Sequence, residues 1–123
     1  QDAIIGNPIY DLVSLVDDVR IRTSTSLKEK IFNFYLSKTS KKLSKKIKEL
    51  KNDFNILSIQ RNLKILGIFY RLFKRDKKKY YLKFMPYTWK LIEMRLRDDM
   101  FKNLKLLLNK AVSKKHRTRI VFR

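Results

Sequence analysis

Residues 54–73 read FNILSIQRNLKILGIFYRLF, the strongest structural signal in the chain. Their apolar side chains recur at intervals of three and four, which is the spacing of one face of an α-helix. From residue 65 onward the segment is apolar nearly all round, a composition typical of a helix enclosed by its neighbours. The longest apolar stretch, Asn62 to Phe73, is broken by Lys64 and Arg71 and is shorter than the roughly 20 residues of a membrane span. We therefore predict a long helix at the centre of a packed fold.

The segments that precede this helix also follow a helical period. Asn7 and Pro8 suit a helix start, because asparagine caps the first amides and proline fits the first helical position. The residues expected to be buried on this first helix are Leu12, Leu15, Val16 and Val19. Asp17, Asp18 and Arg20 are expected to face solvent. Ser26 and Glu29 form the Ser-x-x-Glu capping box of a second helix, which would end near residues 37–40. Its inner face would carry Leu27, Ile31, Phe34 and Tyr35.

The rest of the chain predicts further helices. Residues 41–73 carry an apolar stripe of Leu43, Ile47, Leu50, Phe54 and Leu57, and the pattern leaves open one rod or two pieces broken near Asn52-Asp53. After a charged turn, Pro86 is placed to start a helix over 87–96. Asp98 or Asp99 would cap a last helix carrying Phe101, Leu104, Leu107, Leu108 and Val112. With only two glycines and two prolines, the chain is predicted to be all-α, with about five packed helices.

Composition narrows the classes of function. The chain has 123 residues, which is one domain or part of one. Its 31 Lys+Arg against 11 Asp+Glu give a formal net charge of +20, a field that attracts nucleic acid, anionic lipid or phosphorylated ligands. The absence of cysteine and the single histidine, His116, leave little for a transition-metal site, and His116 is expected to be exposed to solvent. The first residue is Gln1 and no signal-peptide pattern follows, which suggests an internal start.

Three segments resemble a known family. Residues 1–15, QDAIIGNPIYDLVSL, are similar to the segment after the metal-binding aspartate of aminoglycoside-phosphotransferase-like (choline-kinase-type) kinases. Residues 55–72 look like the core helix of the branch that phosphorylates the amino sugars N-acetylmuramate and N-acetylglucosamine, and residues 80–96 resemble its next helix. The order and approximate spacing agree with the family. Residues 23–51 match only in being helical, and the tail after residue 112 does not match.

The resemblance implies a part of an enzyme. Residues 1–112 would be the helical C-terminal part of a protein-kinase-like C-lobe, and residues 113–123 a basic C-terminal tail. The intact parent would transfer a phosphoryl group from ATP, with Mg²⁺ on the phosphates and an aspartate as base. These groups would be held mainly by residues ahead of Gln1, so the chain alone is expected to be inactive and to bind no cofactor. Its expected partners are the amino-sugar substrate and the N-terminal part of the same polypeptide, in the cytoplasm.

The resemblance also implies candidate site residues, although none of them is catalytic. The substrate-binding candidates are Gln1, Asp2, Gln60, Arg61 and Lys64. Gln1 and Asp2 would lie close to the metal-binding aspartate, whereas the other three interrupt an apolar helix, where an arginine fork or an amide could orient a sugar hydroxyl or carboxylate. Asp11 would brace the catalytic loop from the first turn of its helix. Capping by the aspartates and a solvent-facing polar strip remain the simpler alternatives.

Two rival functions follow from the lysine surplus. The first is a basic helical nucleic-acid-binding module, which salt-dependent binding with sequence preference would support. Because the lysines of 41–51 lie mostly opposite the apolar stripe and no recognition motif is present, we expect no specific nucleic acid. A membrane-surface helix is less favoured still, because the lysine-rich helix lacks interfacial tryptophan. Trp89, Tyr80, Tyr81, Phe69 and Phe73 are interpreted as packing residues rather than as a stacking platform.

Overall fold

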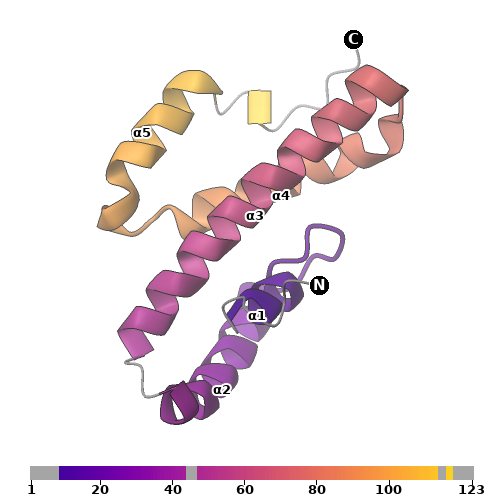
Figure 1. Cartoon of the computed structure of the whole chain (residues 1–123). Helices are drawn as coiled ribbons and strands as arrows, with labels where there is room; N and C mark the ends of the chain where they lie inside the picture. The colour runs from indigo at the N-terminus through magenta and orange to yellow at the C-terminus, as the bar shows by residue number, and fades with distance from the viewer. Residues whose placement is uncertain (1–8, 44–46, 114–115, 118–123) are drawn as a thin grey trace. The chain divides into compact units, whose positions relative to one another are not determined.

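The computed structural model describes residues 9–43, 47–113 and 116–117. All regular secondary structure in these ranges is helical (Figure 1). The elements are α1 (Ile9–Val16), α2 (Thr25–Leu43), α3 (Ile47–Asp76), the 3-10 helix η2 (Lys79–Phe84), α4 (Met85–Arg95), the 3-10 helix η3 (Asp99–Phe101) and α5 (Lys102–Ala111). No strand occurs within the described ranges. The all-α prediction, with five α-helices, is therefore confirmed.

The chain divides into two compact units, Gln1–Ser58 and Ile59–Arg123. The boundary falls within α3, which continues through Asn52 and Asp53, so the break considered there does not occur. Residues 41–43 belong to α2 and α3 begins at Ile47, so a single helix over 41–73 is not found either. The predicted division between residues 112 and 113 stays a prediction.

The first unit has a small apolar core. Its fully or almost fully buried members come from α1, α2 and α3: Ile9, Leu12, Val13, Val16, Leu36, Leu50 and Phe54. The ring of Phe32 packs beside that of Phe54, with the ring centroids 4.6 Å apart. Burying a side chain of this size contributes about 1.5–3 kcal/mol to stability. Leu50 and Phe54 confirm the predicted stripe, whereas the side chains of Leu43 and Ile47 lie outside the described residues.

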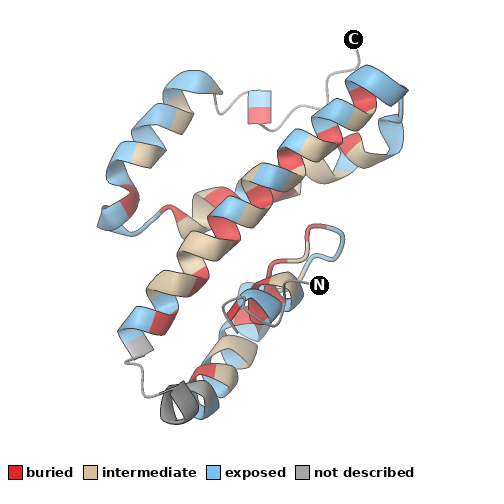
Figure 2. Ribbon diagram, in the orientation of Figure 1, coloured by how far each residue is buried: buried red, intermediate tan, exposed pale blue. Residues whose placement is uncertain are grey.

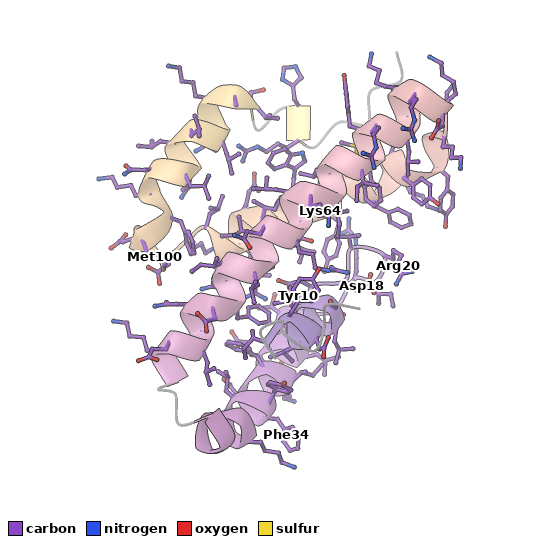
Figure 3. The ribbon with its side chains drawn as sticks, in the orientation of Figure 1. Tyr10, Asp18, Arg20, Phe34, Lys64 and Met100 are labelled. Carbon is purple, nitrogen blue, oxygen red and sulfur yellow. The ribbon has the colours of Figure 1, made fainter. Side chains whose placement is uncertain are left out.

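The face of α2 that packs differs from the predicted one. Leu27 and Phe34 were expected inside, but they are 48% and 64% exposed, and Phe34 projects from the outer side of the helix (Figure 3). Lys28 and Leu36 are buried instead, and Ile31 and Tyr35 are partly buried against the core as expected. The same kind of error affects α1, because Leu15 is exposed. Two apolar stripes on one helix compete, and spacing alone does not select between them.

The start of α2 is capped by a different serine from the one predicted. The helix begins at Thr25, and the hydroxyl of Ser24 accepts a hydrogen bond from the backbone N–H of Leu27 at 3.2 Å. The predicted Ser26–Glu29 capping box is therefore wrong, because Ser26 already lies within the first turn. The tetrad Thr23-Ser24-Thr25-Ser26 offers four hydroxyls that can cap, so the sequence did not select among them.

Replacing Ser24 with alanine tests this assignment. We expect Ser24→Ala to lower the free energy of unfolding by about 1 kcal/mol, because the N–H of Leu27 loses its acceptor. Ser26→Ala, the matched control in the same turn, should change it by less than about 0.5 kcal/mol. Urea unfolding followed by circular dichroism measures both values. The opposite ranking would restore the Ser26 capping box.

In the second unit, the later part of α3 packs against η2. Leu66, Phe69 and Phe73 are buried along one side of α3, and Phe69 stacks on Tyr81 with ring centroids 5.5 Å apart. The other side of α3 is open, as Figure 2 shows by the pale blue along it, and Tyr70 is among its exposed residues. The prediction that residues 65–73 are enclosed on all sides is therefore wrong for one face.

The predicted proline start of α4 is confirmed. Pro86 lies in the first positions of the helix, which runs over Met85–Arg95, close to the predicted range. The hydroxyl of Thr88 donates to the backbone carbonyl of Phe84 at 2.7 Å and secures the first turn. Leu91 and Ile92 are the buried apolar residues of α4.

The end of α3 and the start of α5 show how the helices of the second unit are bounded. Lys77 adopts a positive φ of 57°, and its N–H bonds the carbonyl of Phe73 at 3.1 Å, which terminates α3 in a left-handed turn. Asp98 caps η3 through Met100 rather than starting α5 directly. Phe101 is buried as predicted, but α5 has no buried residue and Leu107 is exposed. No helix in the described ranges has the length and apolar character that crossing a membrane requires.

Candidate functional site

The predicted polar residues of α3, Gln60, Arg61 and Lys64, differ in their exposure to solvent. Gln60 and Lys64 are four residues apart, so they share one side of the helix, and both are exposed (Lys64 is labelled in Figure 3). Arg61 lies on the flank of that strip and is only partly accessible to solvent. Asn62, next to it, is fully buried. The three residues that were predicted together therefore do not have the same surroundings.

Arg61 differs from its two neighbours in one further respect. Its Nη1 atom is shielded from solvent and has no hydrogen-bond partner in the described part of the chain. A guanidinium carries its charge at all physiological pH values and presents five N–H donors in a planar fork. A shielded donor without an acceptor costs free energy, which an anionic oxygen would offset. Of the three predicted substrate contacts on α3, Arg61 is therefore the one with a shielded N–H donor that could bind an anionic oxygen.

The other predicted site residues lie near the start of the chain. Asp11 is exposed in the first turn of α1, where its carboxylate interacts favourably with the helix dipole. This position suits either capping or the proposed bracing role, so the alternatives remain. Gln1 and Asp2 lie outside the described residues. Asp11 belongs to the first unit, whereas Gln60, Arg61 and Lys64 belong to the second.

A buried ion pair in the first unit was not predicted. The Nζ atom of Lys28 lies 3.2 Å from Oδ1 of Asp17 and also donates to the backbone carbonyl of Val16. The hydroxyl of Ser58 donates to Oδ2 of Asp17 at 2.6 Å. All three side chains are almost completely buried, with Lys28 only 4% exposed. The prediction that Asp17 faces water is therefore wrong.

The sequence did contain a signal for this network. Ile9, Val13 and Asp17 are spaced by four, and so are Lys28, Phe32 and Leu36, which places each charged residue at the end of an apolar stripe. Asp17 was assigned to the solvent-facing side because charged side chains are seldom buried without a partner. Each is the other's partner. The network joins the end of α1 to α2 and α3, which is a structural role rather than a catalytic one.

A second unpredicted ion pair lies at the end of the second unit. Arg117 is only 3% exposed, and its Nη1 donates to Oε2 of Glu93 at 2.9 Å. Its Nε donates to the carbonyl of Val112 at 3.1 Å, and its guanidinium carbon lies 4.6 Å from the ring centroid of Trp89. Residues 113–123 were expected to form a basic tail, but Arg117 is packed against α4. His116 is exposed, as predicted.

The aromatic residues are mostly packing residues, as predicted. Phe69 and Phe73 are buried and Trp89 is partly buried. Tyr80 departs from the prediction because it is exposed, and the Nζ atom of Lys83 lies 4.0 Å from its ring centroid. This cation–π contact covers part of the ring that a stacked ligand would need.

The charged segment after Phe73 is a dense basic region. Its one acidic residue, Asp76, accepts a hydrogen bond from Nε of Arg75 at 3.1 Å. This hydrogen bond is the main reason that the pKa of Asp76 is lowered, and the positive charges of Lys78 and Arg71 act in the same direction. Cations here also complement the negative end of the α3 dipole, so the charge run has a structural explanation.

The described residues do not fit a metal site of their own. They contain no group of three or more histidine, aspartate or glutamate side chains that could hold a metal ion. Mg²⁺ in a phosphotransferase is bound by carboxylates and phosphate oxygens.

Comparison with known proteins finds one informative relative. The chain is 29% identical over 112 residues to the N-acetylmuramate/N-acetylglucosamine kinase of Caulobacter vibrioides, and the match covers 91% of the chain. It covers 30% of the relative, so the chain spans less than a third of that protein's length. No family model matches the chain, and no solved structure matches it significantly. The chain is thus similar to a stretch of an amino-sugar kinase.

Proposed function

We propose that this chain is the helical C-terminal part of an ATP-dependent amino-sugar kinase, acting on N-acetylmuramate and N-acetylglucosamine. The observation that carries the proposal is the similarity over 112 residues to a kinase of that name. The all-helical structure is compatible with a kinase-like C-lobe, which is helical. In the intact parent, a sugar hydroxyl, the anomeric one, accepts the γ-phosphoryl group and ADP leaves.

The proposal divides the work between this chain and the rest of the parent. ATP, Mg²⁺ and the catalytic aspartate belong to the other part, and this chain forms a wall of the sugar site. Gln1, Asp2, Gln60, Arg61 and Lys64 are the proposed substrate contacts, and Asp11 is the proposed brace of the catalytic loop. Because its proposed substrates are cell-wall amino sugars, the parent would act in cell-wall recycling. Because it would use ATP, we place it in the cytoplasm.

The test is an assay of the full-length protein encoded by the reading frame that contains this chain. We expect ATP-dependent phosphorylation of N-acetylmuramate and N-acetylglucosamine, measured as transfer of labelled γ-phosphate, with ³¹P NMR to locate the phosphate on the anomeric oxygen. The isolated 123-residue chain is the matched control, and it should give no turnover.

The outcomes separate the proposed function from its rivals. If the full-length protein phosphorylates neither sugar, the amino-sugar kinase assignment is wrong. Turnover of an aminoglycoside in place of the sugars would keep the kinase class and change the substrate. Tight, sequence-selective binding of nucleic acid that weakens with salt, together with no turnover, would favour the basic nucleic-acid-binding module.

A further inference from the structure

Arg61 has an unsatisfied donor at a position that is not sealed from solvent. Its Nη1 is shielded and lacks a hydrogen-bond partner in the described ranges, while the side chain as a whole remains partly accessible. Burial of an unpaired guanidinium donor is costly, and in folded proteins such groups usually meet an acceptor. The first question is therefore whether the second unit itself could supply that acceptor.

The acidic residues of the second unit are few, and most are committed elsewhere. Within four residues of Arg61 along α3 there is no aspartate or glutamate, so no helical ion pair can form. Asp76 is paired with Arg75, Glu93 with Arg117, and Asp98 accepts the N–H of Met100. In a chain of net charge +20, an anion from outside is the natural counterpart of Arg61.

The two sugars of the proposed function differ in the group that such a fork would bind. N-acetylmuramate carries a carboxylate on its lactyl ether, and N-acetylglucosamine has a hydroxyl at the same carbon. A planar guanidinium binds a carboxylate through two parallel N–H···O bonds, whereas an ammonium acts as a point charge. Arg61 can therefore discriminate between the two sugars without taking part in phosphoryl transfer.

We propose that Arg61 is a specificity-determining residue that binds the lactyl carboxylate of N-acetylmuramate. The inference rests on the proposed function and adds to it the residue that separates the two substrates. Lys64 and Gln60 are less suited, because both lie on the exposed strip of α3 and neither has a shielded donor without a partner. A single charge-assisted contact of this kind changes kcat/KM by roughly 10- to 100-fold.

The experiment uses Arg61→Lys in the full-length protein, with kcat/KM measured for both sugars. Lysine keeps the charge but loses the fork, so kcat/KM for N-acetylmuramate should fall by roughly 10- to 100-fold, and that for N-acetylglucosamine should stay within about 3-fold. Arg71→Lys, the same change at an exposed position of α3, is the matched control and should alter neither value by more than about 2-fold.

A change on the substrate side makes the test independent of folding of the variant. The amide of N-acetylmuramate lacks the negative charge, so the unaltered protein should use it roughly 10- to 100-fold less well than the acid. Arg61→Lys should weaken that preference, because the ammonium keeps the positive charge but loses the two parallel N–H···O bonds to the carboxylate. Equal losses for both sugars, or an unaltered protein that does not prefer the acid to the amide, would overturn the inference alone. Absence of turnover of either sugar in the unaltered protein overturns the proposed function as well.

Discussion

Replacing Lys28 with methionine is expected to lower the free energy of unfolding of the first unit by about 3–5 kcal/mol. Methionine is apolar and similar in length to lysine, so the side chain should still pack against its neighbours. The lost free energy then comes from removal of the positive charge. Without the Nζ atom, the buried carboxylate of Asp17 loses the positive charge that lies 3.2 Å away, and the carbonyl of Val16 loses a donor. Amide hydrogen exchange along α1 and α2, which reports local opening, measures the loss in this unit directly.

Two further variants identify the cause. Arg20→Ala removes an ion pair with Asp18 whose arginine side chain is 72% exposed, so it should cost less than about 0.5 kcal/mol (Figure 3). The double variant Asp17→Leu with Lys28→Met removes both charges and should recover most of the stability lost in Lys28→Met. A loss below about 1 kcal/mol in Lys28→Met would mean that Asp17 regains water, and the buried pair would then not explain the packing of α2.

Helix positions were predictable because they depend on local patterns. Pro86 marked the start of α4, and the spacing of Leu50 and Phe54 marked the buried side of early α3. The face of α2 was not predictable in the same way, because Leu27 and Phe34 form as regular a stripe as Phe32 and Leu36 do. Which stripe packs is decided by the partner of Lys28, and that partner, Asp17, is eleven residues away in the sequence.

The candidate site was predictable only in part. The sequence drew attention to Gln60, Arg61 and Lys64 as polar residues in an apolar helix, but their different exposure needed the structure. Nothing in the sequence indicated that Arg117 packs against α4, because an arginine in a basic run usually remains in solvent. The partners of Arg117, Trp89 and Glu93, are four residues apart and so lie on the same side of α4.

Replacing Arg117 with alanine is expected to destabilise the second unit by about 3 kcal/mol. The variant loses a charge-assisted hydrogen bond to Glu93, a bond to the carbonyl of Val112 and the contact with the Trp89 ring. Glu93 is 39% exposed, so water can solvate it after the change, and the loss should be smaller than for Lys28→Met. Trp89 is the only tryptophan, so its fluorescence in a urea titration follows this unit specifically.

Arg117→Lys separates the ion pair from the stacking. Lysine keeps the positive charge near Glu93 but cannot lie flat on the indole or reach Val112 with a second donor, so about half of the loss should remain. Lys110→Ala, a change at an exposed residue of α5, should leave the Trp89 transition within about 0.5 kcal/mol. If Arg117→Ala and Lys110→Ala behave alike, the contacts of Arg117 with Glu93 and Trp89 do not stabilise the second unit. If the ranking holds, Arg117 belongs to the folded second unit.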